Sequence, residues 1–481
     1  MRVNYRSNET PSFQLLSKDN IEEIVSSAME VLERVGVRIH EKQAVAVLKK
    51  AGALSTDDLL VKIPSTMVQQ ALATVPSRVV LAGRDGRRDA VLEKDRIYFG
   101  TGSDCPFFVD PETGARRTTV FADVLNAAKV VDALPHLDFL MSLGLVSDAP
   151  AATYDRHQFL AMVQGTSKPM IITSVDGRGL RDQHAMACAV VGGKERFRLN
   201  PLFAIYAEPN SPFVHTREAT EKVLIAAEEG IPLVFVPAPS ACGTAPATLA
   251  GVLTEGLADT FAGLVTHQLV RPGAPFVMGG VFTTLDMRTM VFSYGSPELL
   301  LMDAALSDIG KHLGIPVFST AGCSDAKVFD QQAGLEAGMS VLMAALSGAS
   351  LIHDVGYLES GLLGSLDMLV FSNEAISLAK RLMRGIGVRP ETLALEVLSE
   401  VGPGGNFFDH QHTLEHFKKE IWIPDLLDRG NLQGWQQSGA KDAGQRVRER
   451  VRDILASHQP LALEEKLVAE LKAMIRSAEG K

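Results

Sequence analysis

The segment Leu202-Phe-Ala-Ile-Tyr-Ala-Glu208 is a short apolar run that stops abruptly at a carboxylate. Continuous apolar runs of this length are typical of strands buried on both faces, as in a parallel sheet. One more strand candidate lies upstream of the others. The pattern therefore predicts an α/β protein with a (β/α)8 TIM barrel. Six further apolar runs end at a small or polar residue or, in one case, at Pro237: Leu137–Val146, Lys168–Ile172, Ile231–Val236, Ala274–Val281, Ile315–Phe318 and Ser350–Ile352.

Helix-length segments separate these runs, and their apolar residues follow the 3.6-residue period. Residues 18–75 are expected to be helical, with Asn20 as the N-cap of the first helix. Residues 78–108 alternate short extended runs with Gly and Asp turns. We therefore expect three regions: N-terminal helices with a β-rich cap in residues 1–117, the barrel in residues 118–375, and a helical region packed on the barrel in residues 376–481.

Composition narrows the class of protein. The 481 residues are 46% hydrophobic, which is enough for a large core, and the net charge of −10 argues against a nucleic-acid partner. Four widely spaced cysteines without a C-x-x-C pair are typical of reduced thiols in the cytoplasm. No signal-peptide pattern and no run of apolar residues long enough for a membrane span is present. A cytoplasmic protein without a membrane partner is expected, and a homo-oligomer remains open.

Residues that follow a barrel strand are the first candidates for chemistry, because active sites of this fold lie where the strands end. His353 and Asp354 end one strand and Glu208 ends another. A carboxylate there can hold a cation or act as a base, whereas its structural alternative is an ion pair with a barrel arginine. His353 could instead bond a neighbouring loop. Lys327 could form a Schiff base, but it lies beyond its strand, which favours a structural ion pair.

The sequence gives only weak support for a metal site or a nucleotide site. His412 and His416 are spaced i and i+4, yet no H-E-x-x-H motif is present. Cys242 or Cys323 could form a zinc site with His353, but the spacing fixes nothing. No glycine-rich phosphate-binding motif is present. We expect no metal site in this chain.

Three segments resemble the trimethylamine:corrinoid methyltransferase superfamily across nearly the whole chain. They are SKDNIEEIVSSAMEVLERVGVRIH (residues 17–40), PVFSTAGCSDAKVFDQQAGLEAG (316–338) and GGNFFDHQHTLEHFKKEIWIPDLLDRGNLQGW (404–435). The resemblance implies a TIM barrel and a separate corrinoid protein as methyl acceptor, so the cobalamin belongs to the partner and none is tightly bound here. Founding archaeal members carry pyrrolysine and demethylate trimethylamine. This chain has only standard residues, and it resembles the bacterial branch that demethylates quaternary amines.

The resemblance implies methyl transfer from a small quaternary amine, with glycine betaine as the first choice and proline betaine or carnitine as alternatives. Glu208 and His353 are the predicted catalytic pair. Aromatic faces suit a quaternary cation, and small polar groups suit a betaine carboxylate. The predicted substrate-binding residues are Tyr98, Phe99, Tyr206, Phe213, Ser319, Thr320, Gly322, Cys323, Asp354 and Tyr357.

Two other classes of function stay open at this point. The same barrel could host a zinc-dependent methyltransferase or a Schiff-base lyase. It could also bind a betaine without catalysis, or serve as a scaffold for a partner. Metal analysis, borohydride trapping and turnover with reduced cobalamin would separate these possibilities.

Overall fold

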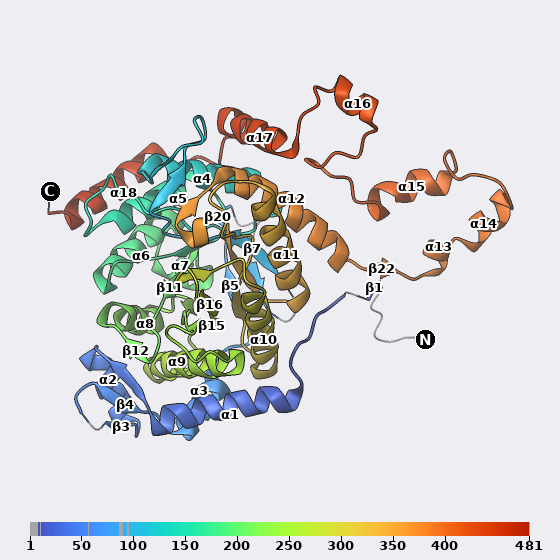
Figure 1. Ribbon diagram of the computed structural model, residues 1–481. Coiled ribbons are helices and arrows are strands. Elements are labelled where there is room, and N and C mark those ends of the chain that lie inside the picture. Colours follow the sequence, from blue (N-terminus) through green and yellow to red (C-terminus); the bar gives the residue numbers. More distant parts are fainter. Residues whose placement is uncertain (1–7, 10, 56, 86–89, 94–95, 481) are drawn as a thin grey trace.

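A closed barrel of parallel strands forms the centre of the protein (Figure 1). The computed structural model describes residues 8–9, 11–55, 57–85, 90–93 and 96–480. Phe139 and Leu140 form parallel bridges to Gly100 and Met170, which places an eighth strand between the two outer strands and closes the sheet. The seven regular strands, in their spatial order, are β10 (Met170–Ile172), β11 (Phe203–Ala207), β13 (Leu233–Phe235), β15 (Phe276–Gly279), β18 (Val317–Thr320), β19 (Leu351–Val355) and β7 (Tyr98–Thr101).

The predicted fold is thereby confirmed, and each of the seven apolar runs contributes a strand to the barrel. The barrel starts earlier than expected, however, because β7 pairs with β19 upstream of residue 118. Without β7, the backbone groups along the free side of β19 would lack partners.

Helices surround the barrel in the expected alternation. Several begin at a side chain that accepts a hydrogen bond from a first-turn N–H, namely Asp176, Thr216, Ser296, Asp330 and Ser365. These caps set where each helix starts after its strand. The helices are α4 (Phe121–Ala133), α5 (Tyr154–Gly165), α6 (Gly177–Val191), α7 (Lys194–Leu199), α8 (Arg217–Glu229), α9 (Leu249–Val270), α10 (Pro297–Leu313), α11 (Gln331–Ser347) and α12 (Leu366–Met383).

Alternate strand residues fill the inside of the barrel. Ile171, Val234, Val277, Phe318 and Leu351 belong to one buried cluster. The hairpin of β5 (Val79–Leu81) and β6 (Ala90–Leu92) joins this cluster, and the backbone N–H of Val91 donates to Tyr98 Oη at the start of β7. The hairpin therefore closes the N-terminal end of the barrel and leaves the other end, which we call the mouth, for the site.

Two small sheets stand on the mouth side, because their strands follow barrel strands in the chain. One contains β14 (Ser240–Ala241), β16 (Thr283–Asp286) and β17 (Val291–Ser293). The other contains β20 (Tyr357–Leu358), β21 (Leu363–Gly364), β8 (Phe107–Val109) and β9 (Arg116–Thr118), with the short 3-10 helix η1 (Glu359–Gly361) between its first two strands.

The N-terminal region is not wholly helical, as the sequence had suggested. Helices α1 (Lys18–Arg34), α2 (Lys42–Lys50) and α3 (Ser65–Thr74) alternate with strands β2 (Val37–Ile39), β3 (Leu54–Ser55) and β4 (Leu60–Lys62). These strands form a sheet with β12 (Val214–His215), which pairs with β2. Ser17, rather than Asn20, caps α1, because its hydroxyl accepts from the Asn20 N–H.

The C-terminal region is only partly packed on the barrel. Strand β22 (Ile386–Gly387) pairs with β1 (Asn8–Glu9), after which the chain leaves the body (Figure 1). Four short helices that follow contain no buried residue: α13 (Pro390–Leu393), α14 (Leu395–Val401), α15 (Gln411–Glu420) and α16 (Leu432–Gln437). The chain then returns as α17 (Ala443–Ser457), which contacts α12 and α4, and α18 (Glu465–Ala478), which contacts α5 and α6. Among the described residues, none of the helices combines the length and apolarity that a bilayer crossing requires.

Candidate active site

The carboxyl ends of β11, β18 and β19 bring Glu208, Thr320 and His353 to one mouth. Tyr206 Oη donates to Glu208 Oε2 over 2.8 Å, and the Tyr206 ring lies 6.1 Å from the Phe318 ring. Phe318 in turn lies against the His353 ring, with centroids 4.0 Å apart. A continuous series of contacts thus connects the ends of three strands, which is where barrel enzymes carry their chemistry.

His353 and Asp354 form a buried pair. His353 Nδ1 lies 2.8 Å from the Ser319 carbonyl oxygen, which can only accept, so Nδ1 carries a proton. Nε2 lies 3.1 Å from Asp354 Oδ1. Burial lowers the pKa of His353 to about 3 and raises the pKa of the Asp354 carboxyl well above its usual range. Burial thus disfavours the charged form of both groups.

Glu208 faces Lys222 on α8. The Glu208 side chain is exposed to the space above the barrel, yet the surrounding protein raises its pKa by desolvation. Lys222 is half-buried, donates to the Ser174 carbonyl at 3.3 Å, and has a pKa lowered by burial despite the nearby Glu208 and Asp104 charges. Asp104, after β7, accepts from Gln158 at 2.9 Å, and burial raises its pKa. The mouth thus contains several carboxyl groups and one lysine.

Three tyrosines stand among these acids. Tyr294 and Tyr357 contact each other edge to face at 6.1 Å, and Tyr206 lies close enough to Tyr294 for that phenol to raise its pKa. Burial raises the pKa of all three phenols, and the Asp354 charge adds to each shift. The rings therefore stay neutral and present aromatic faces and edges beside carboxyl groups.

Backbone conformation at the strand ends is unusual. Asp104, Leu143 and Asp354 have positive φ angles of 61°, 60° and 73°. Such angles cost energy for residues other than glycine and are found preferentially at functional sites. Gly102 has no room for a side chain, because a Cβ there would overlap the Tyr357 ring and the Asp354 carboxylate. The mouth is therefore fixed by local backbone geometry as well as by side chains.

Two polar atoms of the mouth have unused hydrogen-bonding capacity. Within the described part of the chain, Thr320 Oγ1 and Asp354 Oδ2 are buried without a well-formed hydrogen bond, although the Thr320 hydroxyl lies close enough to the Asp354 carboxyl to lower its pKa. Buried polar groups are normally paired, so unpaired ones mark places where a ligand or water is expected.

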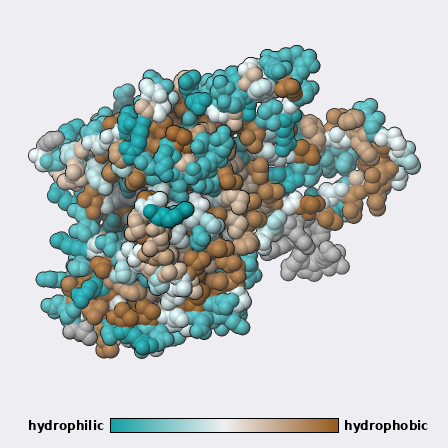
Figure 2. Space-filling view, viewed as in Figure 1, coloured by the Kyte–Doolittle hydropathy of each residue, from teal (hydrophilic) through white to brown (hydrophobic). Residues whose placement is uncertain are grey.

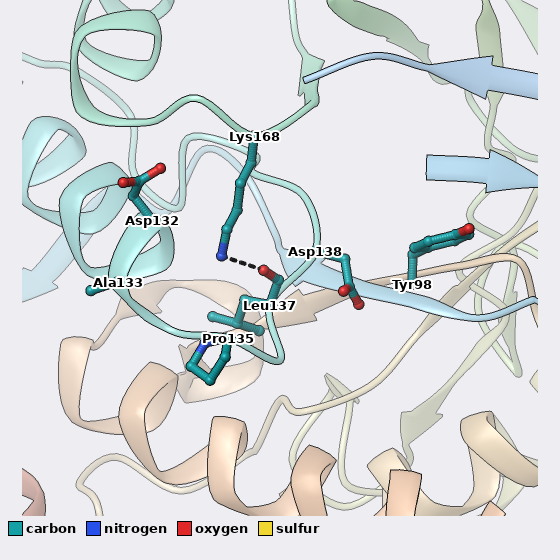
Figure 3. Close-up of a pocket in the computed structure, with 7 residues that line it drawn as sticks. All are labelled: Tyr98, Asp132, Ala133, Pro135, Leu137, Asp138 and Lys168. Atoms are coloured by element: carbon teal, nitrogen blue, oxygen red, sulfur yellow. Dashed lines mark hydrogen bonds between the residues drawn. The ribbon is translucent and has the colours of Figure 1, made fainter. Parts of the chain in front are cut away.

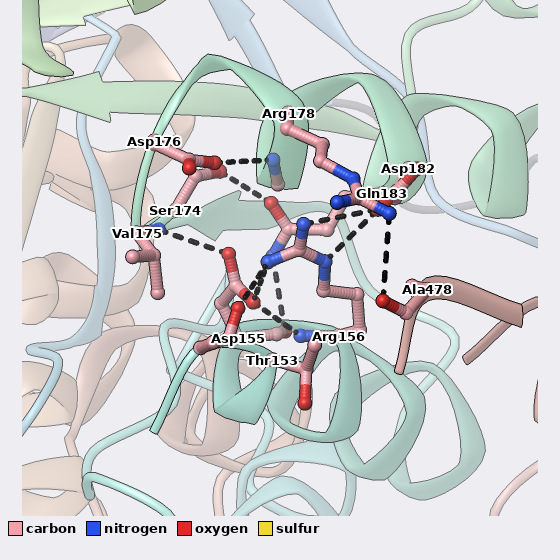
Figure 4. A network of polar contacts seen from close by, with 12 residues as sticks. Thr153, Asp155, Arg156, Ser174, Val175, Asp176, Arg178, Asp182, Gln183 and Ala478 are labelled. Carbon is pink, nitrogen blue, oxygen red and sulfur yellow. Dashed lines mark hydrogen bonds and ion pairs between the residues drawn. The ribbon is translucent and has the colours of Figure 1, made fainter. Parts of the chain in front are cut away.

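A buried ion-pair network supports the loop after β10 (Figure 4). Asp155 pairs with Arg156 at 2.7 Å and accepts from the Val175 N–H at 2.9 Å, while Arg156 also reaches Asp182 at 2.9 Å. Ser174, which binds Lys222, directly precedes Val175. The network therefore holds the carbonyl that positions the lysine.

Some predicted site residues lie elsewhere. Tyr98 begins its strand rather than ending it, and it lines a cavity of about 360 Å³ at the N-terminal end of the barrel (Figure 3). Phe99 points outward into the core beneath the helices, because strand side chains alternate. Phe213 packs in that same outer core, on the loop that leads to β12. These three residues are not part of the mouth.

The loop after β18 contributes less than expected. Thr320 points inward, but Ser319 alternates to the outer side, towards Asp303. The Gly322 amide already donates to Ser340 Oγ at 3.0 Å, and Cys323 packs in the outer core. Neither the amide nor the thiol is placed to bind a ligand in the mouth.

The remaining candidates lie outside the mouth. Lys327 is exposed and donates to the Asp325 carbonyl at 2.6 Å. His412 and His416 stack on each other on α15. Over the described residues, no three His, Cys, Asp or Glu side chains gather closely enough to hold a metal together.

Tyr294, Asp104 and Lys222 were not predicted. Asp104 could have been found, since it follows the upstream strand candidate. Tyr294 follows a hairpin that interrupts the usual passage from strand to helix, and Lys222 lies in the second turn of a helix. Neither position carries a clear sequence signal.

A parallel barrel with acids and tyrosines at the carboxyl ends of its strands is the arrangement of a (β/α)8-barrel enzyme. The family model described as "Trimethylamine methyltransferase (MTTB)" matches residues 1–480. The chain belongs to this family and is an enzyme of the methyltransferase class.

Individual relatives agree with this assignment. A trimethylamine methyltransferase MttB of Desulfitobacterium hafniense (strain DCB-2) is 32% identical over 96% of this chain and 93% of that protein. A trimethylamine methyltransferase MttB of Methanosarcina barkeri is 32% identical over 97% of this chain and 95% of that protein. A glycine betaine methyltransferase of Desulfitobacterium hafniense (strain Y51) is 27% identical over 97% of each chain. The solved structure of the Methanosarcina barkeri monomethylamine methyltransferase shares the fold, with a TM-score of 0.54 and 14% identity over 92% of this chain and 88% of that one.

Proposed function

We propose that this enzyme transfers a methyl group from a small quaternary amine, most specifically glycine betaine, to the Co(I) corrinoid of a separate corrinoid protein. The observation that carries this proposal is the composition of the mouth. Glu208 and Asp354 stand with Tyr206, Tyr294 and Tyr357 around the ends of three strands. Acids and aromatic faces together are the chemistry that recognises a permanent cation.

A quaternary ammonium relieves the electrostatic cost of the free site. Desolvation disfavours the ionised form of Glu208, as its raised pKa indicates. A cation beside the carboxylate restores a favourable interaction, and each aromatic face adds about 0.5–2 kcal/mol. The buried Thr320 hydroxyl, which lies beside the Asp354 carboxyl, can donate to the carboxylate of a betaine.

The chemistry of the leaving group favours a quaternary substrate. One C–N bond breaks, its electron pair stays on nitrogen, and the neutral tertiary amine leaves without needing a proton. The Co(I) corrinoid of the partner supplies the two-electron nucleophile that accepts the methyl group. The residues of this chain hold the cation, orient one methyl towards the partner and exclude water.

Tertiary amines need activation before a methyl group can leave, a task that the family resemblance assigns to pyrrolysine. This chain has a standard residue at every one of its 481 positions. The relatives named for trimethylamine are slightly more similar in sequence than the relative named for glycine betaine, so sequence identity does not choose between the two substrates. The substrate proposal therefore rests on the cation chemistry of the mouth.

The test is a panel of methylated amines assayed with reduced cobalamin, followed by absorbance. We expect turnover with glycine betaine or another quaternary amine, such as proline betaine or carnitine, and none with trimethylamine. Equal rates with trimethylamine would overturn the proposal. Activity that disappears with a chelator would favour the zinc-dependent alternative. A covalent substrate adduct trapped by borohydride would favour the Schiff-base alternative. Binding of a betaine without any turnover would identify a binding protein.

A further inference from the structure

Lys222 is a basic residue of the mouth that has hydrogen-bond donors left for a ligand. Hydrophilic side chains are spread over the face of the protein shown in Figure 2, so an exposed lysine would not indicate a site. Lys222 is instead half-buried, in the second turn of α8. Among the described residues, its ammonium makes one hydrogen bond, to the Ser174 carbonyl oxygen at 3.3 Å, and no ion pair. An ammonium has three donors, so two of them remain.

Asp104 lies near Lys222 but already has other partners. Asp104 Oδ1 accepts from Gln158 Nε2 at 2.9 Å and from Thr173 Oγ1 at 3.3 Å. The charge of Lys222 acts on this carboxyl, since it lowers the pKa that burial raises. Neutral donors nevertheless bond the carboxyl, so it does not depend on the ammonium for a partner.

Glu208 is a second acid near Lys222, at the end of the strand that precedes α8. Its Oε2 accepts from Tyr206 Oη at 2.8 Å. The charge of Lys222 lowers the pKa of the Glu208 carboxyl, yet no ion pair joins the two side chains within the described chain. Two opposite charges that are near each other without contact are complementary to a small zwitterion, whose ammonium faces the acid and whose carboxylate faces the lysine.

The carbonyl that holds Lys222 is fixed from both sides (Figure 4). The Ser174 hydroxyl donates to Gln183 Oε1, and the next backbone N–H, that of Val175, donates to Asp155 Oδ2 at 2.9 Å. Both acceptors are buried. The ammonium is therefore anchored to a rigid part of the strand end, and an anchored group loses less conformational freedom when it binds a ligand.

We propose that Lys222 binds the carboxylate of the substrate and makes the enzyme selective for betaines over quaternary amines that lack a carboxylate. This inference rests on the proposed function, because it requires a quaternary amine in the mouth. The Thr320 hydroxyl can also donate to a carboxylate, but it is neutral and lies beside the Asp354 carboxyl. Hydrogen bonds from a charged donor to a carboxylate are about twice as strong as neutral ones. Lys222 is thus the residue that determines specificity.

The test measures binding by calorimetry, without the corrinoid protein, for glycine betaine and for choline, which lacks the carboxylate. The wild type should bind glycine betaine about tenfold or more tightly than choline, as expected for one charged hydrogen bond. Lys222→Met keeps the length of the side chain and should remove this preference. It should bind choline at least as tightly as the wild type, because a positive charge near the ammonium is gone. Retained choline binding also shows that the mouth is folded.

Two further variants make the test specific. Lys222→Arg keeps the charge and should keep part of the preference for glycine betaine. Lys472→Met removes an exposed lysine of α18 and should change neither affinity. Thr320→Val should retain the preference, and a preference lost there but kept in Lys222→Met would overturn the proposal by assigning the carboxylate to β18.

The outcome for the wild type separates this proposal from the proposed function. Equal affinity and equal turnover for glycine betaine and choline would overturn the role of Lys222 and leave a quaternary-amine methyltransferase. Proline betaine and carnitine also carry a carboxylate, so whichever of the three zwitterions binds best should lose affinity in Lys222→Met. Absence of binding and of turnover for every quaternary amine would overturn the proposed function itself, and with it the role of Lys222.

Discussion

The Asp325 carboxylate accepts a hydrogen bond from the backbone N–H of Tyr294 over 2.8 Å. The same carboxylate accepts from the Gly295 N–H at 3.1 Å and from Ser360 Oγ at 2.8 Å, and the Ser293 hydroxyl also donates to it. A single side chain after β18 thus fixes the segment after β17 that carries a tyrosine of the mouth. Asp325 is a positioning residue, because it acts on the site through Tyr294.

Removing this support should weaken substrate binding. We expect Asp325→Ala to raise KM for the quaternary amine about tenfold, with a smaller effect on kcat, because a displaced ring forfeits about 1.4 kcal/mol of binding. Tyr294→Ala should act in the same way, and the double variant should be no worse than Tyr294→Ala alone. Asp286→Ala, which removes a similar acceptor at the exposed turn of the same hairpin, is the control and should leave KM unchanged. Additive effects of the two mutations would show that Asp325 does not act through Tyr294.

Glu208→Gln keeps the shape of the side chain and removes its charge. Methyl transfer should fall at least tenfold, since a charged contact in a poorly solvated site is worth about 1.5–3 kcal/mol. The folded protein should become more stable at neutral pH, because the variant no longer places a charge in an environment that disfavours it. Kinetics and thermal unfolding measured on the same sample decide the outcome. Glu218→Gln, an exposed change on the same helix as Lys222, should alter neither quantity.

The raised pKa of Glu208 predicts how activity depends on pH. A cation binds the ionised carboxylate, so kcat/KM should fall as pH drops through the Glu208 pKa, at a higher pH than for an ordinary glutamate. The contribution of Glu208 to folding stability depends on pH in the opposite direction. The folded state holds the Glu208 proton more tightly than the unfolded state, so stability falls as pH rises from the ordinary to the raised pKa. A kcat/KM profile for Glu208→Gln that keeps the wild-type acid limb would assign that limb to another group.

His353 should make the protein sensitive to acid. The unfolded chain binds a proton at this residue below its ordinary pKa of 6.5, whereas the folded state does so only near pH 3. Its contribution to stability is thus present above pH 6.5 and is lost as pH falls towards 3. His353→Ala should reduce this acid-induced loss of stability and slow methyl transfer at least tenfold. Lys327→Ala, at an exposed site, should leave methyl transfer unchanged.

Arg156 should be the costliest residue of the network to remove. Arg156→Met leaves Asp155 buried without its cation, which typically costs about 3–5 kcal/mol. The midpoint of urea unfolding should fall accordingly. Arg178→Met, at an exposed position of the neighbouring α6, should change it little. Equal midpoints for the two variants would show that the ion pair is not important for stability.

The barrel was predictable because its strands are continuous apolar runs that end in recognisable residues. Glu208 and His353 followed from the same rule, and the structure places both at the mouth. Tyr98 and Phe99 were misplaced because the sequence of a four-residue strand does not reveal which of its ends lies at the mouth. It also does not reveal which side chains point into the barrel. Tyr294 was missed because its position depends on a hairpin held by Asp325, a contact between distant parts of the chain.

Strand β7 pairs with β19 on one side and with the strand around Phe139 on the other. Tyr98 therefore pairs with Leu351, although most of the barrel sequence lies between these two residues. Contacts between such distant residues form slowly, because a long loop must close first. Until β19 arrives, the partly built sheet has two open edges that can pair with other chains. Productive folding of this protein thus depends on the late closure of the barrel that creates the mouth. Aggregation during synthesis or refolding is the process that competes with this closure.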